Sequence, residues 1–395
     1  MATREQRGER QGDRQGEQER QERQERQDWQ ERPLRFGVIG WGYWGPKIAR
    51  NLNSLPAARV TWICDLDAHR LAQVAMDYPL ARVSADPADL FTAEGGDGGD
   101  GGDAVDGVVI ATPVRSHFAL ARQALLAGKH VLVEKPLTAN VAEAAELVAL
   151  AARVGRTLMV GHTFEYSPAV NELRALVRTG ELGRLYCVET ERLNLGLFRN
   201  DIDVIWDLAP HDVSILNYVL GEEPISVRVA AHGHLRAAIA DNAHLDLQYA
   251  TGATAHIHVS WMHPTKVRRV TLIADDRMAV YDDTNPQEML RLFNKGADVG
   301  ADPVVSYRNG AITIPHIEWA EPLRLECDDF ATAIRSGATP RANGAVGLAV
   351  VRILAAAQQS LLAGGAIVAL TSNKTPEMVP TRASHRTVQA DAHAG

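Results

Sequence analysis

The chain has 395 residues, of which 46% are hydrophobic and 23% are charged, values typical of a globular protein of about two domains. Its formal net charge of -8 gives no positive field that would attract nucleic acid or anionic lipid, so neither partner is expected. The three cysteines, Cys64, Cys187 and Cys327, are too few and too widely spaced for a disulfide framework or a metal site, and they fit a reducing cytoplasm. We expect no signal peptide and no membrane span, because the N-terminus is polar and no apolar run approaches about 18 residues.

Both ends of the chain and one internal segment have compositions that do not favour folding. Residues 1–33 are almost entirely Arg, Gln, Glu and Gly and cannot bury enough apolar area to offset the entropy of ordering, so a disordered tail is predicted, with a weak interaction tail as the alternative. Residues 94–103 repeat Gly and Asp without the longer repeat of calcium-binding loops, which indicates a flexible surface insertion. The polar stretch 372–395 is expected to fray.

A glycine pattern typical of dinucleotide-binding loops follows the first apolar run of the folded chain. Residues 36–39 have the composition of a short buried strand, and a helical pattern runs from Pro46 to Leu52. Between them, residues 40–45 have the spacing G-x-G-x-x-G, which lets the backbone approach a pyrophosphate while the helix N-terminus offers N–H groups to its oxygens. The cofactor contacts predicted here are Gly40, Gly42, Tyr43, Trp44 and Gly45.

An acidic residue stands where such folds bind the ribose of the cofactor. A second strand, 59–64, ends in Asp65, about 20 residues beyond the last glycine of the loop. Its carboxylate can accept hydrogen bonds from both ribose hydroxyls and would repel a 2′-phosphate, so NAD is favoured over NADP. Arg70 could in principle reach a 2′-phosphate, and a position on the helix surface is the alternative.

The first domain, 34–160, alternates strands with helices, which indicates right-handed crossovers and a doubly wound parallel sheet. One helix is expected to begin after Thr138 or Asn140 as its N-cap. The other predicted elements are helices at 68–77 and 117–128, a short strand near Val83, and strands at 105–111, 131–134 and 157–160.

A lysine follows the apolar, β-branched strand that begins at Val131. Glu134, Lys135 and Pro136 end this strand, and a charged pair has little structural reason to stand there. Because ligands of open parallel sheets sit just outside the carboxyl ends of the strands, Lys135 is predicted to lie where the cofactor meets the substrate. A surface lysine at a strand-to-helix turn is the alternative.

The second domain is predicted to span 161–371 and to contain an α/β fold with a mainly antiparallel sheet. Long alternating strands are typical of a sheet with one covered face and one open face, and Thr251-Gly252 is a hairpin signal. The predicted elements are helices at 168–178, 205–216, 321–336 and 345–362, and strands at 185–192, 243–249, 254–261 and 266–274.

Two polar residues of the 205–216 helix are spaced to act together. Asp207 and His211 are four residues apart, so their side chains share one helix face. A histidine beside a carboxylate can act as a general base near neutral pH, and with Lys135 such a pair suits hydride transfer at an alcohol carbon. The alternative for His211 is a histidine of the first helical turns without a chemical role.

These motifs together resemble the Gfo/Idh/MocA oxidoreductase family, from about Leu34 to about Thr371. The resemblance rests on the glycine loop, on Ala111-Thr112-Pro113, on Glu134-Lys135-Pro136 and on Asp207-x-x-x-His211, in this order. It implies an N-terminal Rossmann domain and a C-terminal domain whose open sheet face often forms the oligomer interface, so a homo-oligomer, dimer or tetramer, is expected.

The resemblance also implies roles for individual residues. Lys135 and His211 would be catalytic, with His211 as proton acceptor, Lys135 holding and polarising the substrate oxygen, and Asp207 orienting His211. The cofactor-contacting positions implied are Thr112, Pro113, His117, Glu134 and Lys135, with His162 near the nicotinamide or substrate.

A narrower likeness is to nucleotide-sugar 3-dehydrogenases of this family, such as those acting on UDP-N-acetylglucosamine. It rests on residues 161–168 and on residues 194–199 leading into 206–212. Arg192, Asn194 and Arg199 would then meet the sugar, a carboxylate or a diphosphate, and ordinary loop polarity is the alternative. The expected function is NAD-dependent oxidation of a secondary sugar hydroxyl; a dehydrogenase of a free polyol such as an inositol, and a non-catalytic dinucleotide-binding regulator, are the alternatives.

Overall fold

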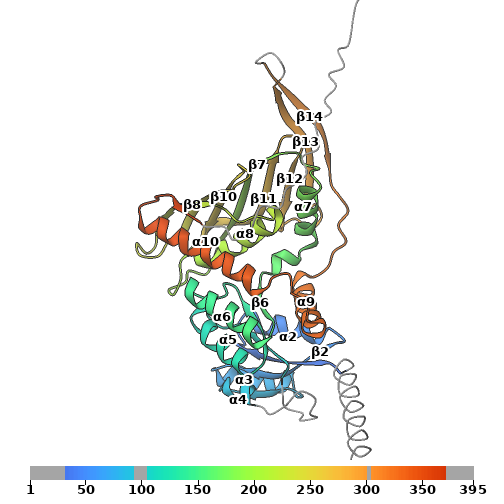
Figure 1. The fold of residues 1–395 in the computed structure, drawn as a ribbon, viewed down its shortest axis with the longest axis vertical. Coiled ribbons are helices and arrows are strands. Elements are labelled where there is room, and N and C mark those ends of the chain that lie inside the picture. The colour runs from blue at the N-terminus through green and yellow to red at the C-terminus, as the bar shows by residue number, and fades with distance from the viewer. Residues whose placement is uncertain (1–31, 93–104, 300–303, 371–395) are drawn as a thin grey trace, which may run out of the picture. The chain divides into compact units, whose positions relative to one another are not determined.

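The computed structural model describes residues 32–92, 105–299 and 304–370 (Figure 1). The chain forms two compact units, one containing the sequence up to Thr163 together with Glu321–Val351, the other Phe164–Ala320 together with the sequence from Arg352. The predicted insertion 94–103, the tail 372–395 and nearly all of the tail 1–33 lie outside the described residues. Arg32, inside the predicted tail, forms an ion pair of 2.7 Å with Asp106.

The first unit contains a six-stranded sheet in which every neighbouring pair of strands is parallel. Its order, β3-β2-β1-β4-β5-β6, confirms the predicted doubly wound Rossmann sheet. Successive strands step outward in opposite directions from β1 and from β4, so right-handed crossovers place the helices on both faces. The strands are β1 (Leu34–Ile39), β2 (Ala58–Cys64), β3 (Arg82–Ser84), β4 (Gly107–Ile110), β5 (His130–Glu134) and β6 (Leu158–Gly161).

The helices between these strands begin close to their predicted positions. Of the two N-caps considered for α6, the structure selects Asn140, whose side chain accepts a hydrogen bond of 2.9 Å from Glu143 N–H. The Thr138 hydroxyl instead donates to the carbonyl of Asn140, so the prediction of Thr138 as the cap is wrong. The helices are α2 (Gly45–Asn53), α3 (Ala68–Asp77), α4 (Ala88–Thr92), the 3₁₀ turn η1 (Val114–Ser116), α5 (His117–Leu126) and α6 (Val141–Val154).

Two C-terminal segments return to the first unit, although the sequence assigned them to the second domain. Helix α9 (Pro322–Ser336) packs on α2, and the rings of Phe36 and Phe330 lie 5.6 Å apart. The carbonyl of Ala342 accepts a hydrogen bond from Val160 N–H of β6. Helix α10 (Gly344–Leu362) begins in the first unit, and the division falls inside it, after Val351. The boundary 161–371 therefore misses this return, because an amphipathic pattern shows that a helix covers a core but not which core.

The second unit contains a nine-stranded sheet in the order β14-β13-β12-β11-β7-β10-β9-β8-β15. Among its strand pairs, β7 with β10 is parallel and the others are antiparallel, so the predicted mainly antiparallel sheet is confirmed. The predicted hairpin at Thr251-Gly252 joins β9 to β10, and Gly252 adopts a φ of 88°, which favours glycine. The strands are β7 (Leu185–Leu195), β8 (Ser226–His232), β9 (Asn242–Gln248), β10 (Thr254–Ser260), β11 (Met262–Ala274), β12 (Met278–Asp282), β13 (Leu290–Val299), β14 (Val305–Thr313) and β15 (Val368–Ala369).

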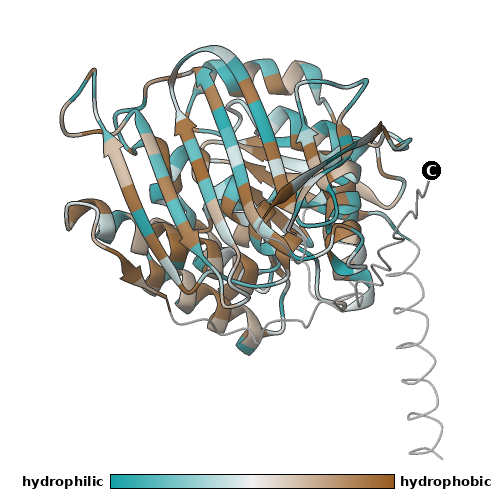
Figure 2. Ribbon diagram, turned by 90° about the horizontal axis from the view of Figure 1, so that it is seen from above, coloured by the Kyte–Doolittle hydropathy of each residue, from teal (hydrophilic) through white to brown (hydrophobic). Residues whose placement is uncertain are grey.

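Helices cover one face of this sheet. Helix α8 (Val204–Leu220) lies against β7, β9 and β10, and α7 (Pro168–Arg178) packs on α8 and β12, after the 3₁₀ turn η2 (Thr163–Tyr166). Side chains alternate along the strands in hydropathy (Figure 2), and on β9 the apolar Ala243, Leu245 and Leu247 are buried while the polar residues between them are half-buried or exposed. The second face of the strands therefore carries polar residues, as a sheet with one open face requires.

Helix α10 is, among the described residues, the one helix that is long and apolar enough to cross a membrane, by length and composition. Half of its most apolar window is buried inside the structure. The hydroxyl of Ser360 on this helix donates to the carbonyl of Ala366 and accepts from Val229 N–H of β8. These contacts are those of a core helix.

Candidate active site

The glycine loop after β1 has the backbone that a dinucleotide requires. Gly40 has a φ of 98°, and a Cβ there would lie 2.6 Å from the carbonyl oxygen of Ala111. A Cβ at Gly45 would collide with the carbonyl oxygen of Gly40, whereas one at Gly42 would meet nothing within 4 Å. Gly40 and Gly45 are therefore required by the turn itself, and Gly42 borders open space at the N-terminus of α2. The loop thus fits the pyrophosphate of NAD.

Asp65 is fixed against this loop at the end of β2. Its Oδ2 accepts a hydrogen bond of 2.6 Å from Trp41 N–H, and its Oδ1 accepts one of 2.9 Å from Asp67 N–H. The half-exposed guanidinium of Arg70 lies 3.4 Å from Oδ2. The carboxylate therefore has a fixed orientation beside the glycine loop, which fits its predicted contact with the cofactor ribose.

His117 ties together the loops that follow β4 and β5. Its Nδ1 lies 2.9 Å from the carbonyl oxygen of Pro136, and its Nε2 lies 2.8 Å from that of Thr112. Burial lowers the pKa of the imidazole, and the positive charge of Lys135 acts in the same direction. The ring is 1% exposed and both nitrogens face protein carbonyls, so His117 supports the two loops from inside, and its contact with the cofactor stays a prediction. Thr112 itself is half-buried and Pro113 is exposed.

Glu134 and Lys135 differ sharply in environment although they are adjacent. Lys135 is half-buried at the end of β5, where the sequence predicted it. Glu134 is buried, and desolvation raises its pKa to about 7 even though the Lys135 ammonium opposes the shift. Gly161 of β6 pairs with Glu134, and a Cβ there would lie 3.4 Å from the carboxyl carbon. A small residue at 161 therefore makes room for the Glu134 side chain.

His162 is buried near the same lysine, at the carboxyl end of β6. Its side chain is 1% exposed, and neither ring nitrogen has a hydrogen-bond partner among the described residues. Burial, with a smaller contribution from the Lys135 charge, lowers its pKa to about 3. A buried imidazole with two open hydrogen-bonding positions beside Lys135 is suited to receive a polar group of a ligand.

The low pKa of His162 predicts an acid-sensitive stability. The folded protein holds a neutral imidazole, whereas the unfolded chain binds a proton below about pH 6.5, so stability is lost as the pH falls from there toward 3. Relative to a His162→Gln variant, the wild-type free energy of unfolding should fall by about 3 kcal/mol between pH 7.5 and pH 4.5. Denaturant unfolding at both pH values measures it. The exposed His69, changed to Gln, is the control, and an equal pH dependence in both variants would refute the prediction.

Asp207 and His211 share the accessible face of α8 in the second unit. The side chain of Asp203 caps this helix by accepting hydrogen bonds from the N–H groups of Ile205 and Trp206. Both predicted site residues are half-buried, whereas helix residues on the opposite side, such as Ala209 and Val213, are fully buried. The predicted spacing therefore does bring the two side chains to one face that a ligand can reach.

Asp207 has a hydrogen-bond donor that the sequence did not suggest. The indole N–H of Trp261 donates to its Oδ2 across 3.0 Å. His211 has an aromatic neighbour of its own, Phe164, with ring centroids 5.2 Å apart in an edge-on arrangement. Each member of the pair is thus held by an aromatic residue distant in sequence.

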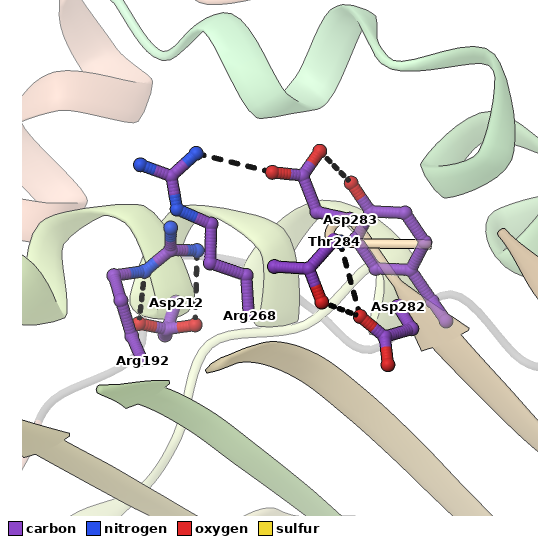
Figure 3. A network of polar contacts seen from close by, with 7 residues as sticks. Arg192, Asp212, Arg268, Asp282, Asp283 and Thr284 are labelled. Atoms are coloured by element: carbon purple, nitrogen blue, oxygen red, sulfur yellow. Dashed lines mark hydrogen bonds and ion pairs between the residues drawn. The ribbon is translucent and has the colours of Figure 1, made fainter. Parts of the chain in front are cut away.

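Arg192, predicted to bind substrate, is instead part of a buried ion pair (Figure 3). Its Nε and Nη2 donate to the two carboxylate oxygens of Asp212, at 2.8 and 3.2 Å. The Arg192 side chain is 6% exposed, that of Asp212 is 1% exposed, and the guanidinium lies 4.5 Å from the ring centroid of Phe164. Its charge is therefore already neutralised inside the unit by Asp212, and the substrate contact of Arg192 stays a prediction.

The remaining predicted substrate residues lie at the end of β7 and in the loop beyond it. Asn194 is half-buried, and Arg199 forms a bidentate pair with Asp201 at 3.1 and 3.0 Å. The Asp201 carboxylate, and to a smaller degree that of Asp207, raises the pKa of Arg199. Arg199 therefore lies in the electrostatic neighbourhood of Asp207, as a substrate-side residue would.

Comparison with known proteins agrees with this geometry. The family model described as "Oxidoreductase family, NAD-binding Rossmann fold" matches residues 34–162, and the GFO/IDH/MocA C-terminal domain matches residues 170–281. UDP-N-acetylglucosamine 3-dehydrogenase of Acidithiobacillus ferrooxidans is 32% identical over 332 residues, which cover 82% of this chain and 96% of that protein. The chain belongs to the Gfo/Idh/MocA oxidoreductase family.

A further relative and two solved structures are also similar to this chain. The solved structure of the Acidithiobacillus enzyme superposes with a TM-score of 0.68 at 28% identity, covering 83% of this chain and 97% of that one. GenD2 from gentamicin A biosynthesis, solved in complex with NAD, gives 0.71 at 25% identity, covering 86% and 97%. Inositol 2-dehydrogenase of Rhodococcus erythropolis is 33% identical over 201 residues, 50% of this chain and 55% of that protein.

Family membership settles the class of chemistry. The chain is an NAD-binding dehydrogenase that acts on CH–OH groups, as its relatives are. Among the described residues, no three His, Cys, Asp or Glu side chains are grouped so that they could hold a metal ion.

Proposed function

We propose that this enzyme oxidises a secondary hydroxyl of a nucleotide-activated sugar, at C3 of a UDP-N-acetylhexosamine. The relative named for that reaction is 32% identical along 96% of its own length, whereas the scyllo-inositol 2-dehydrogenase of Bacillus subtilis is 25% identical along 89%. The observation that carries the proposal is the α8 pair, in which Asp207 and His211 share a half-buried helix face and the Asp207 carboxylate is held by a hydrogen bond.

We propose the following division of roles. The residues that would hold NAD are those of the glycine loop, Asp65 and the ends of β4 and β5, and NAD supplies the hydride acceptor when it is bound. His211 accepts the hydroxyl proton, and Asp207 orients the imidazole and stabilises its protonated form. Lys135 donates a hydrogen bond to the substrate oxygen and so favours the negative charge that develops there.

The substrate is tested by a panel assay of NAD reduction. UDP-N-acetylglucosamine is expected to give a kcat/KM at least about 10²-fold above those of myo-inositol and free N-acetylglucosamine, because a site built for a polar group rejects analogues that leave it unpaired. NADP in place of NAD is the cofactor control. A higher kcat/KM for myo-inositol than for UDP-N-acetylglucosamine would indicate a polyol dehydrogenase and contradict the proposal.

We also propose a cytoplasmic homo-oligomer that associates through the open face of the nine-stranded sheet. The alternation of β9 supports this, since the exposed His244, Asp246 and Gln248 lie together on its outward side. Light scattering of the preparation used for the assay, if it gave the mass of one chain, would rule out the oligomer.

A further inference from the structure

Trp261 occupies a fixed position between β10 and β11. Its side chain is 1% exposed and is among the largest fully buried side chains of the described chain. Its backbone N–H donates to the carbonyl of Asp241, and its carbonyl accepts from Gly196 N–H. Phe198 meets the indole edge-on with centroids 5.9 Å apart. The ring therefore cannot move without disturbing several contacts, and it acts as a rigid part of the core.

The polar edge of this ring is directed at the proposed site. The indole has a single donor, its Nε1–H, and a buried tryptophan needs an acceptor for it. That acceptor is Oδ2 of Asp207, 3.0 Å away and 54 residues distant in sequence. A hydrogen bond to a carboxylate is among the stronger ones because the acceptor is charged.

The space around the indole is closely filled on the side of the connection between β7 and α8. A Cβ at Gly196 would lie 3.1 Å from Cδ1 of Trp261, so a larger residue would press on the ring. Residue 196 begins the connection between β7 and α8, in which Arg199 also lies. The same indole therefore contacts both the helix of the proposed base and the loop that leads into it.

We infer that Trp261 is a positioning residue for the reaction: its indole N–H holds the Asp207 carboxylate in one orientation, so that Asp207 can orient His211. This inference rests on the proposed function, because it assigns Trp261 a part through Asp207. The hydrogen bond from Trp261 occupies Oδ2 of Asp207 and so fixes the orientation of the carboxylate on α8.

The test begins with Trp261→Phe, which removes the N–H and keeps an aromatic ring. With UDP-N-acetylglucosamine and NAD, kcat should fall about 10-fold or more, while the KM for NAD changes less than about 2-fold, since the glycine loop belongs to the other unit. Trp261→His, which keeps a ring N–H, should recover part of the rate.

A double-mutant cycle separates positioning from general packing. In an Asp207→Ala background, Trp261→Phe should have little further effect on kcat, because its action passes through the missing carboxylate. Additive losses would show a packing role alone and overturn the inference, and so would a Trp261→Phe enzyme with full kcat. The exposed Trp319, changed to Phe, is the control for loss of an indole.

A measurement on folded protein without a substrate completes the test. In enzyme labelled with ¹⁵N-tryptophan, the indole N–H resonance of Trp261 should move upfield when Asp207 is changed to Ala, and an unmoved resonance would contradict the hydrogen bond. An Asp207→Ala enzyme with full kcat would instead refute the proposed role of the pair, independently of that resonance. The two failures are thus distinguishable.

Discussion

Replacing His211 with Gln is expected to lower kcat about 10²–10⁴-fold, the range attributable to a positioned general base. Glutamine favours helix and retains a polar side chain, and His211 is half-buried on the accessible face of α8, so the fold should tolerate the change. The KM for NAD should be nearly constant because the loss falls on the chemical step. Steady-state kinetics at saturating NAD, with circular dichroism to verify folding, measures this effect.

The substitution Lys135→Met tests the proposed role of a residue of the first unit, as His211→Gln does for the second unit. A similar volume is kept, but the ammonium that would donate to the substrate oxygen is lost, so kcat should again fall at least about 10²-fold with NAD affinity retained. The exposed His232, changed to Gln, is the matched control for His211. Full turnover in either His211→Gln or Lys135→Met would remove that residue from the mechanism.

Most of the fold follows from local patterns in the chain. The glycine loop and the β-branched strands around it have physical causes that act within a few residues, namely the tight turn at Gly40 and the burial of both faces of a parallel strand. The start of α6 likewise has a local cause, because the side chain of Asn140 caps the helix. The packing of α9 against α2 could not be predicted in this way. It requires the chain to come back to the first unit after the second, and no local pattern encodes that.

Some features of the candidate site likewise have local causes, and others depend on residues distant in sequence. The spacing of Asp207 and His211 is a property of one helix and is correctly predicted from the period of 3.6 residues. The donor on Asp207 comes from Trp261, 54 residues away, and a sequence gives no distance across the sheet. A buried tryptophan that ends a strand next to a candidate site is nevertheless a usable signal, because its indole N–H must find an acceptor.

Arg192 shows why charge alone does not identify a substrate residue. An arginine on a strand near a site can face a ligand or can neutralise a buried carboxylate, and the choice depends on what lies opposite in three dimensions. Here the opposite residue is Asp212, next to His211 in sequence, so the guanidinium is directed into the unit. Arg268, overlooked in the sequence, reaches the same cluster with its side chain 37% exposed and pairs with Asp283 at 3.1 Å (Figure 3).

Changing Arg192 to Ala is expected to destabilise the protein by about 3–5 kcal/mol, the cost of leaving a buried charge without its partner. The Asp212 carboxylate is 1% exposed and would lose both bidentate hydrogen bonds. Burial already raises the pKa of Asp212 against the opposing charges of Arg192 and Arg268. Without Arg192 that pKa rises further, so Asp212 takes up a proton on folding and the destabilisation should be larger at pH 8 than at pH 5.

Two further variants separate the charge from the packing in this prediction. Arg192→Met combined with Asp212→Leu removes both charges and fills similar volume, so it should recover most of the stability lost by Arg192→Ala, and its dependence on pH should disappear. Arg122→Ala breaks the exposed pair with Glu146, also 2.8 Å long, and should cost less than about 1 kcal/mol. Denaturant unfolding of all three variants gives the comparison. If Arg192→Ala costs no more than Arg122→Ala, the Arg192–Asp212 pair does not stabilise the packing of α8 against β7.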